Sequence, residues 1–273
     1  MTTHPTQAEK GAAFRALHEG EPFVIPNPWD AGAARVLEAL GFRALATTSS
    51  GFAWSLGRAD NHVRLEDALA HFYEIASAVE VPVNADFEGG FAIEPVHIVA
   101  NVKRATETGI AGLSIEDSSG DAADPLFPFS LSVERIQAAR EAIDGSGTEI
   151  VLTGRSEGFI VGRPDLDETL RRLKAYADAG ADCLYAPGIK SVADICAVVE
   201  AVSPKPVNVL AYADFATVAE LAELGVRRIS IGGALARTAW TGFLEAATEI
   251  AEKGTFRALG RAVSGSVLNR KFS

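Results

Sequence analysis

Cysteine and long apolar runs are the scarcest features of this 273-residue chain. Its two cysteines, Cys183 and Cys196, are too few for a disulfide framework, and their spacing matches no zinc motif. Each lies in an apolar stretch, where free cysteine packs as a small hydrophobic side chain. No apolar run is long enough to cross a bilayer, and residues 1–10 have no signal-peptide core. We therefore expect a soluble protein of the cytoplasm.

Basic residues are also in deficit. Lysine and arginine total 25 against 36 aspartates and glutamates, which gives a formal net charge of −11. This acidity argues against nucleic acid or an anionic membrane as the partner. A small anionic ligand stays compatible with it, because a metal ion or a few focused donors reverse the field locally. With 48% hydrophobic and 22% charged residues, the composition is typical of a globular enzyme.

The chain repeats one local pattern, a helix-like run that ends in glycine and is followed by a strand-like run. Glycine adopts the left-handed conformation that ends a helix, and apolar or β-branched residues then favour a strand. The four units are GFRALATTSS from Gly41, GIAGLSIED from Gly109, GADCLYAPG from Gly180 and GVRRISIGG from Gly225. With four further candidates, strands begin near residues 22, 43, 81, 110, 149, 181, 206 and 226.

Helical periodicity fills the intervals between these strands. The expected helices are Ala31–Leu40, Leu65–Val79, Pro95–Thr108, Val133–Ile143, Asp165–Ala179, Ser191–Val202, Phe215–Leu224 and Leu235–Ile250. Eight strands that alternate with eight helices predict a single (β/α)₈ barrel domain over residues 1–273. A doubly wound open sheet is the alternative, but PNPWDAG after the first strand lacks the glycine-rich dinucleotide fingerprint.

Two segments exceed what a barrel needs. Residues 118–130 (SSGDAADPLFPFS) form a long loop rich in glycine, proline and small polar residues, and loops of this length are often lids. Residues 251–273 extend beyond the eighth helix, with an amphipathic helix expected over Thr255–Val267. Such a helix must bury its apolar face, and a neighbouring subunit on which it packs or with which it is exchanged provides the surface. We therefore expect a homo-oligomer, a dimer or a tetramer.

In a barrel of this kind the carboxyl ends of the strands form the active site. Asn84 and Asp86 are two residues apart on the third strand, so their side chains point to the same face. Glu116 ends the fourth strand, and Asp60 follows the second. Oxygen ligands without a neighbouring histidine suit Mg²⁺, or Mn²⁺, rather than Zn²⁺. The alternative is that these acids only cap the following helices.

Other strand ends offer groups for an anionic ligand. Arg155 follows the fifth strand, and its guanidinium either binds a carboxylate or phosphonate or pairs with Glu157 or Glu116. The sequence TTSSG over residues 47–51 supplies hydroxyl and N–H donors, unless it is an ordinary loop. We expect most of the five histidines at the surface and keep His62 alone as a catalytic candidate.

These residues, in this order, resemble the isocitrate lyase/phosphoenolpyruvate mutase superfamily over essentially the whole chain. The likeness is carried by PNPWDAGAARVLEALGFRALATTSSG, SLGRAD, PVNADFEGGF, LSIED and GRSEGFIVGRPDLDETLRRLKAYADAGADCLY. The resemblance implies a barrel whose final helix is often exchanged between subunits of a dimer of dimers, hence a homotetramer. It also implies Mg²⁺ and a 2-oxo or 2-hydroxy carboxylate, next to which a C–C or P–C bond is made or broken.

By the same resemblance, Asp86 is the central metal-site aspartate, with Glu116 as its partner, Asn84 as a further ligand and Asp60 as a supporting acid. A metal ion that bridges the carbonyl and carboxylate oxygens stabilises the enolate left when the neighbouring bond breaks. The implied substrate-binding residues are Thr48, Ser49, Ser50, Gly51, Asp86, Arg155 and Asn208. The strand-eight turn with Ser230, Gly232 and Gly233 is similar to barrel phosphate sites.

The chain departs from the family in its lid and its metal motif. Isocitrate and 2-methylisocitrate lyases carry a lid cysteine, but residues 118–130 contain no cysteine, lysine or histidine. The phosphonate enzymes place a lysine soon after the Glu-Asp pair, where this chain has Ser118 and Ser119. The family's Asp-x-Asp-Thr-Gly-Tyr/Phe-Gly becomes NADFEGG over residues 84–90. One acid is lost from the metal site, and Glu88 is a candidate to compensate for it.

We therefore expect a Mg²⁺-dependent carbon–carbon lyase or decarboxylase that acts on a small 2-oxo or 2-hydroxy dicarboxylate through a metal-stabilised enolate. The expected catalytic residues are Asp60, Glu116, Arg155 and Tyr185. In a retro-aldol cleavage, Tyr185, His62 or a metal-bound water would take the hydroxyl proton. The alternatives are a P–C bond enzyme of the phosphonopyruvate or carboxyphosphonate type, and a non-catalytic barrel that binds a 2-oxo acid.

Overall fold

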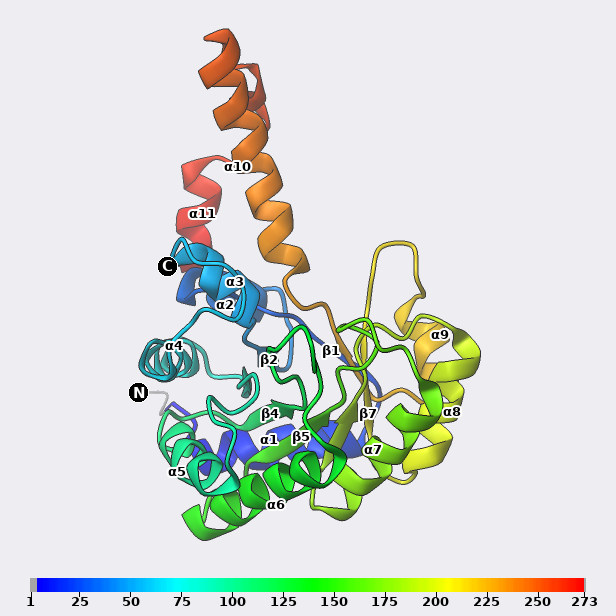
Figure 1. Cartoon of the computed structure of the whole chain (residues 1–273). Coiled ribbons are helices and arrows are strands. Elements are labelled where there is room, and N and C mark those ends of the chain that lie inside the picture. Colours follow the sequence, from blue (N-terminus) through cyan, green and yellow to red (C-terminus); the bar gives the residue numbers. More distant parts are fainter. Residues whose placement is uncertain (1–3, 273) are drawn as a thin grey trace.

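The computed structural model describes residues 4–272, and its centre is an eight-stranded parallel sheet ringed by helices (Figure 1). The strands are β1 (Phe23–Ile25), β2 (Leu45–Ala46), β3 (Val83–Asp86), β4 (Gly112–Glu116), β5 (Val151–Arg155), β6 (Cys183–Tyr185), β7 (Val207–Leu210) and β8 (Arg228–Ser230). They pair in the order β1-β8-β7-β6-β5-β4-β3-β2. Between the two end strands, the backbone N–H of Ala46 donates to the carbonyl of Pro26 (3.0 Å) and closes the ring. The predicted (β/α)₈ barrel is confirmed.

Helices follow the strands as the periodicity predicts. They are α1 (Gln7–Glu19), α2 (Ala31–Ala39), α3 (Ser49–Ser55), α4 (Leu65–Ala78), α5 (Pro95–Thr106), α6 (Phe129–Ser146), α7 (Leu166–Asp178), α8 (Val192–Val202), α9 (Val218–Glu223), α10 (Ala234–Lys253) and α11 (Gly265–Phe272). The eight predicted helices correspond to α2 and α4 to α10. Side-chain caps fix their starts: Asp30 accepts from the N–H of Ala33 (2.6 Å), and Asp165 from that of Glu168 (3.0 Å). Within residues 4–272, no helix is long and apolar enough to cross a membrane.

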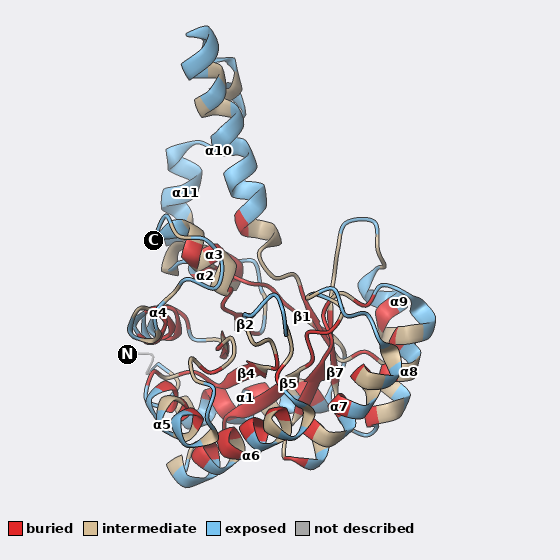
Figure 2. Cartoon of the chain, viewed as in Figure 1, coloured by how far each residue is buried: buried red, intermediate tan, exposed pale blue. Residues whose placement is uncertain are grey.

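The core has two parts. One lies between the outer face of the sheet and the surrounding helices, and the other fills the amino-terminal half of the barrel interior. Figure 2 shows this burial on the strands and on the helix faces turned toward them. Cys183 on β6 is buried in the interior, as predicted. Cys196 is exposed on the outer face of α8, so the prediction that it packs as a hydrophobic side chain was wrong.

Helix α1 was not predicted, and it closes the amino-terminal end of the barrel. Gln7 and Lys10 donate to four backbone carbonyls that precede β3 and β4, those of Ala76, Val79, Thr106 and Ile110. Phe14 of the same helix is fully buried in the interior. Helix α1 thus forms a stopper at this end, and among the described residues the barrel opens at the carboxyl ends of its strands.

The structure excludes one of the two interpretations of TTSSG and corrects the bounds of one predicted helix. TTSSG is not an ordinary loop: Thr48 caps helix α3 and accepts from the N–H of Gly51 (3.4 Å). The helix expected over Thr255–Val267 is wrong in its bounds. Gly254, with φ of +63°, ends α10, and the chain continues as a 3₁₀ turn, η1 (Arg257–Arg261), before α11. Figure 1 shows α10 projecting from the barrel as an arm, with α11 returning toward α2.

Candidate active site

A cavity of about 180 Å³ opens at the carboxyl ends of the strands. The side chains predicted for the site that border it are Thr48, Ser49, Ser50, Asp60, Asn84, Asp86, Arg155, Tyr185, Asn208 and Ser230. Gly232 and Gly233 complete the wall after β8. Glu116 reaches the site through its contact with Arg155, whereas His62 is exposed and does not border the cavity. Except for His62 and the buried Gly51, the structure brings the predicted residues to one place.

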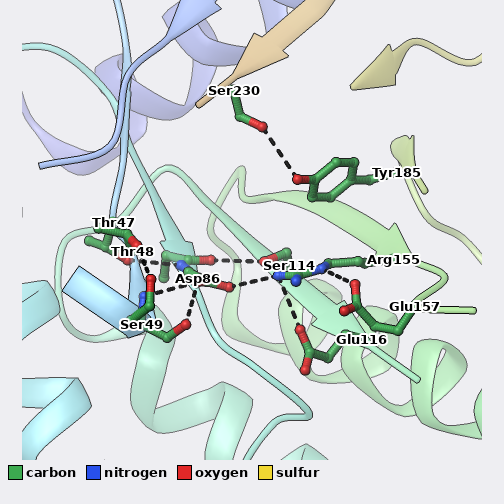
Figure 3. A network of polar contacts seen from close by, with 12 residues as sticks. Thr47, Thr48, Ser49, Asp86, Ser114, Glu116, Arg155, Glu157, Tyr185 and Ser230 are labelled. Atoms are coloured by element: carbon green, nitrogen blue, oxygen red, sulfur yellow. Dashed lines mark hydrogen bonds and ion pairs between the residues drawn. The ribbon is translucent and has the colours of Figure 1, made fainter. Parts of the chain in front are cut away.

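Asp86 ends β3 and is held by the residues that follow β2 (Figure 3). Its carboxylate accepts from the backbone N–H of Ser49 (3.0 Å) and from the Ser49 hydroxyl (2.8 Å). Its own backbone N–H donates to Thr47 Oγ1 (2.9 Å). Both donors of Ser49 are therefore engaged by the protein. The backbone N–H of Ser50 has no partner among the described residues, so it remains available to a ligand.

Arg155 ends β5 and lies among carboxylates. Its Nη1 is 3.3 Å from Asp86 Oδ1 and 3.1 Å from Glu116 Oε2, and its Nε donates to Glu157. Of the pairings open to Arg155 in the sequence, those with Glu116 and Glu157 are thus both present. Burial by itself would lower the pKa of Arg155, but Glu116, Glu157 and Asp86 together raise it well above its ordinary value. The guanidinium is permanently charged and fixed in direction.

The site holds more carboxylate than Arg155 neutralises. Burial, with Asp86 and Asp60 nearby, raises the pKa of Glu88 to about 8. Burial also raises the pKa of Glu116, despite Arg155. Desolvation by the surrounding protein raises the pKa of Asp60, and the charge of Asp86 adds to that shift. A bound cation would relieve this crowding of acids, because Arg155 supplies a single positive charge.

The donor set fits a hydrated hard cation. All its side-chain ligands are oxygens, and the buried Oδ1 of Asn84 has no hydrogen-bond partner. Within residues 4–272, no three His, Cys, Asp or Glu side chains converge as a complete metal cage. Mg²⁺ keeps several waters and needs only one or two carboxylates, so this arrangement is compatible with it and not with a structural zinc site.

Below this acidic rim, the cavity floor is lined by a chain of hydrogen bonds. Ser230 donates toward the Tyr185 hydroxyl (3.5 Å) and accepts from Asn208 Nδ2 (3.0 Å). Asn208 Oδ1 accepts from Nε of Arg228 (2.9 Å). Burial raises the pKa of Tyr185, so its hydroxyl keeps its proton at neutral pH. Arg228 was missed by the sequence analysis, although it lies two residues before Ser230 on the same strand face.

A second missed group positions the site from behind. Asp117 is buried and accepts from the backbone N–H of Glu157 (2.7 Å), from Arg172 Nη1 (3.1 Å) and from the Tyr176 hydroxyl (2.6 Å). Glu157 in turn accepts from Arg155. Asp117 therefore fixes the segment that orients Arg155. Asp117 directly follows Glu116 at the end of β4, but nothing in the local sequence indicates these long-range partners.

The loop of residues 118–130 does not border the cavity. Its backbone forms a small hairpin in which Ser118 pairs with Leu126. Residues 124–128 instead line a separate hollow together with residues 162–165. A role of this loop as a lid stays a prediction.

Comparison with known proteins agrees with this architecture. The family profile of phosphoenolpyruvate phosphomutase matches residues 14–251. Escherichia coli 2-methylisocitrate lyase is 30% identical over 67% of this chain and 64% of its own, and Bradyrhizobium diazoefficiens oxaloacetate decarboxylase is 28% identical over 69% of each.

Two solved structures are similar over nearly the whole chain. A candidate lyase/mutase from Burkholderia cenocepacia is 48% identical, with a TM-score of 0.94 and coverage of 97% of both chains. The 2,3-dimethylmalate lyase, a PEP mutase/isocitrate lyase superfamily member, is 27% identical, with a TM-score of 0.86 and coverage of 99% and 96%. The predicted membership of this superfamily, and the lyase type of enzyme, are thereby confirmed. The chain belongs to the phosphoenolpyruvate phosphomutase family, within the PEP mutase/isocitrate lyase superfamily.

Proposed function

We propose that this protein is a Mg²⁺-dependent lyase that cleaves a carbon–carbon bond in a small 2-oxo or 2-hydroxy dicarboxylate. The observation that carries the proposal is the pairing of Asp86, fixed by Ser49, with the half-buried Arg155 at the rim of a cavity of about 180 Å³. A cavity of this size suits an acid of a few carbons, since it equals roughly six times the volume that one water occupies in the liquid.

The cation site is formed by Asp86 with Glu116 and the unpartnered oxygen of Asn84, in part through water. Mg²⁺ when bound supplies positive charge beside the carboxylate and the 2-oxo or 2-hydroxyl oxygen of the substrate. Mn²⁺ suits the same oxygen ligands. Asp60 and Asp86 keep the rim negative, which favours a divalent cation over a monovalent one.

The remaining donors orient the substrate. The free N–H of Ser50 binds the carboxylate next to the oxo or hydroxyl carbon. Thr48 and Gly51 act indirectly, because they build the capped start of α3 that presents this N–H. Arg155 is held by three carboxylates and directs its charge at the same end of the ligand, and Asn208 contacts the ligand from the floor.

Two side chains transfer protons to or from the substrate. Asp60 lies in the mouth, has no ion-pair partner among the described residues, and takes the proton of a substrate hydroxyl. The bond between C2 and C3 then breaks, its electron pair moves to C3, and C2 becomes a carbonyl. Tyr185 stays protonated at neutral pH and donates to the carbon that received the electrons. Decarboxylation of an oxaloacetate-like acid would use the same rim without the step at Asp60.

The relatives support this range of reactions. A 2-methylisocitrate lyase, a 2,3-dimethylmalate lyase and an oxaloacetate decarboxylase are all similar to this chain. Each of these names describes cleavage next to a carboxylate of a small acid. The differing lid and metal motif of this chain separate it from the first of them in detail.

We also propose that the protein is a homo-oligomer, a dimer or a tetramer, in which α10 packs on a neighbouring subunit. Trp240, Phe243 and Leu244 on this helix are all exposed, Phe243 by 59%. An arm with this much uncovered apolar surface is typical of an interface and not of a monomer surface. The same arm begins directly after Gly233 of the cavity wall, so assembly and the site are adjacent.

A thermal-unfolding screen tests the function. We expect Mg²⁺ together with one dicarboxylate, from a panel of oxaloacetate, 2-oxoglutarate, substituted malates, pyruvate and phosphonopyruvate, to raise the melting temperature more than either alone, because a ligand that binds only the folded state stabilises it. Turnover is then assayed on the acid that gives the shift. A shift confined to phosphonopyruvate would favour P–C chemistry, and no metal-dependent shift with any acid would refute the proposal.

A further inference from the structure

Arg228 is a buried cation whose side-chain partners are all neutral. It begins β8, is 3% exposed and borders the cavity of the site. Its Nε donates to Asn208, and its Nη1 lies 3.4 Å from Nε2 of His18 in the α1 stopper. Burial, and then the charge of Arg228, lower the pKa of His18 to about 3, so this histidine is uncharged. Within residues 4–272, no carboxylate lies within ion-pair distance of Arg228.

The other buried arginines are compensated differently. Arg155 pairs with three carboxylates, Arg172 pairs with two, and Arg135 donates to three backbone carbonyls. A buried charge without a counter-charge is costly to a fold, and a bound anion removes that cost. Arg135 also has no carboxylate partner, and its buried Nε is unpartnered, so Arg228 differs from it in bordering the cavity of the site, where an anion can reach it.

The guanidinium also keeps a donor for such an anion. Nη2 of Arg228 makes no hydrogen bond to any described residue, and it is not sealed away from the cavity. Around it lie the uncharged side chains of Asn208 and Ser230. The floor is therefore positively charged, whereas the rim with Asp86 and Asp60 is negatively charged.

We propose that Arg228 binds the distal carboxylate of a dicarboxylate substrate at the floor of the cavity. This inference rests on the proposed function, which puts the 2-oxo or 2-hydroxy end of the substrate at the rim beside Asp86 and Arg155. Arg228 and Ser230 are two residues apart on one face of β8, so the side chain of Arg228 starts roughly 6.6 Å below the strand end and reaches His18 in α1. Arg228, Asp86 and Arg155 border the same cavity, so the two ends of one small diacid can be bound there together.

The position of this charge also distinguishes the possible reactions. When the C2–C3 bond breaks, the electron pair on C3 is shared with the distal carboxylate, and Arg228 stabilises the negative charge that develops there. In decarboxylation the distal carboxylate leaves as CO₂, and an arginine that binds it as an anion opposes this loss. Arg228 therefore favours a lyase that retains the distal carboxylate.

Binding of malate and lactate in the presence of Mg²⁺, measured by titration calorimetry, tests the inference. Both probes have the 2-hydroxy acid end, but only malate has a distal carboxylate. We expect the wild type to bind malate at least tenfold more tightly than lactate. Arg228→Gln should abolish this preference and leave lactate binding unchanged, and Arg228→Lys should retain part of it. Arg227→Gln is the matched control, since this half-buried neighbour does not border the cavity, and it should behave as wild type.

The outcomes separate the inference from the proposed function. Lactate binding by Arg228→Gln reports that the variant is folded. The comparison of malate with lactate on the wild type does not depend on any variant. If malate and lactate bind the wild type equally, or if Arg228→Gln keeps the preference, the inference about Arg228 is overturned while the proposed function stands. If neither acid binds the wild type with Mg²⁺, the proposed function fails and the inference fails with it.

Discussion

Asp86 accepts two hydrogen bonds from Ser49, one from the backbone N–H and one from the hydroxyl, at 3.0 and 2.8 Å. The start of α3 is thereby fastened to the end of β3. The carboxylate is oriented before any ligand arrives, so little side-chain freedom remains to be lost on binding. It follows that the charge and the direction of Asp86 can be tested separately.

Asp86→Asn keeps the shape of the side chain but removes its charge. We expect it to abolish the Mg²⁺-dependent thermal shift and to lower kcat/KM at least 100-fold, because the cation loses its central ligand. Ser49→Ala keeps the charge and removes one of the two hydrogen bonds, which is worth about 1 kcal/mol, or about fivefold in kcat/KM. An Asp86→Asn protein that still shows the full metal-dependent shift would contradict the assignment of Asp86 as a metal ligand.

Arg155→Lys should be almost as damaging as loss of the charge. A lysine ammonium is a point charge, and it does not reproduce the planar contacts with Asp86, Glu116 and Glu157 at once. We expect kcat/KM to fall at least 100-fold, with Mg²⁺ binding measured by calorimetry changed much less. Arg171→Lys, on the exposed face of α7, is the control and should be without effect. Equal activity of Arg155→Lys and the wild type would show that this residue does not position the substrate.

Asp117→Asn should destabilise the fold rather than act on chemistry alone. It leaves the buried guanidinium of Arg172 with one carboxylate fewer and weakens the tie to Glu157. We expect a loss of about 3 kcal/mol in the free energy of unfolding by urea. Asp67→Asn, which breaks pairs at the surface, should change that free energy far less. A similar loss in both variants would mean that the buried Asp117 network stabilises the fold no more than a surface ion pair does.

Acid should weaken the fold through His71. This histidine is stacked on Phe52 at 3.8 Å, and burial lowers its pKa from 6.5 to about 4. Between these pH values the unfolded chain binds a proton that the folded chain does not, so stability falls as the pH drops. The contribution amounts to about 3 kcal/mol between pH 6.5 and pH 4.

His71→Leu should remove this share of the pH dependence in urea unfolding measured at pH 7 and pH 4. Nε2 of His71 has no hydrogen-bond partner, so the apolar replacement strands no other group. His97→Gln, an exposed position on α5, serves as the control and should leave the fall intact. An undiminished fall in His71→Leu would assign the acid sensitivity to other groups.

Oligomerisation can be tested on the arm. Trp240→Asp with Leu244→Asp puts two charges on the exposed apolar face of α10. We expect light scattering after size exclusion to report a smaller assembly than for the wild type, because charges are costly in an apolar interface. Glu252→Ala, near the end of the same helix, should leave the mass unchanged. A wild type that elutes as a monomer would refute the oligomer outright.

Most of the barrel could be predicted from the sequence, because strand and helix periodicities and the glycines between them are local signals. The carboxylates at the rim could be predicted for the same reason, since the ends of parallel strands meet. α1 could not be placed, because nothing within Gln7–Glu19 indicates the carbonyls near residues 76–79 and 106–110 that it covers. The tie between His18 and Arg228 spans 210 residues and depends on barrel closure.

Some local signals are open to two interpretations. Thr48 followed by small polar residues fits both a loop and a helix cap, and the cap prevails because α3 packs its buried Gly51 and Ala53 inward. In the C-terminal segment, the helical spacing of apolar residues predicts one helix over Thr255–Val267. The carboxylate of Glu249 instead accepts from the N–H groups of Arg257 and Ala258, and the chain turns back there.

The stopper formed by α1 has a consequence for the traffic of ligands. Because α1 closes the amino-terminal end of the barrel, substrate and products enter and leave through the same opening at the carboxyl ends of the strands. If the substrate is bound between Arg228 and Asp86 as proposed, the fragment beside Arg228 is retained until the fragment near Asp86 has left. Product release would then be ordered, with the inner fragment leaving last. The inner fragment would inhibit competitively with respect to substrate, because both bind the empty barrel, whereas the outer fragment would not.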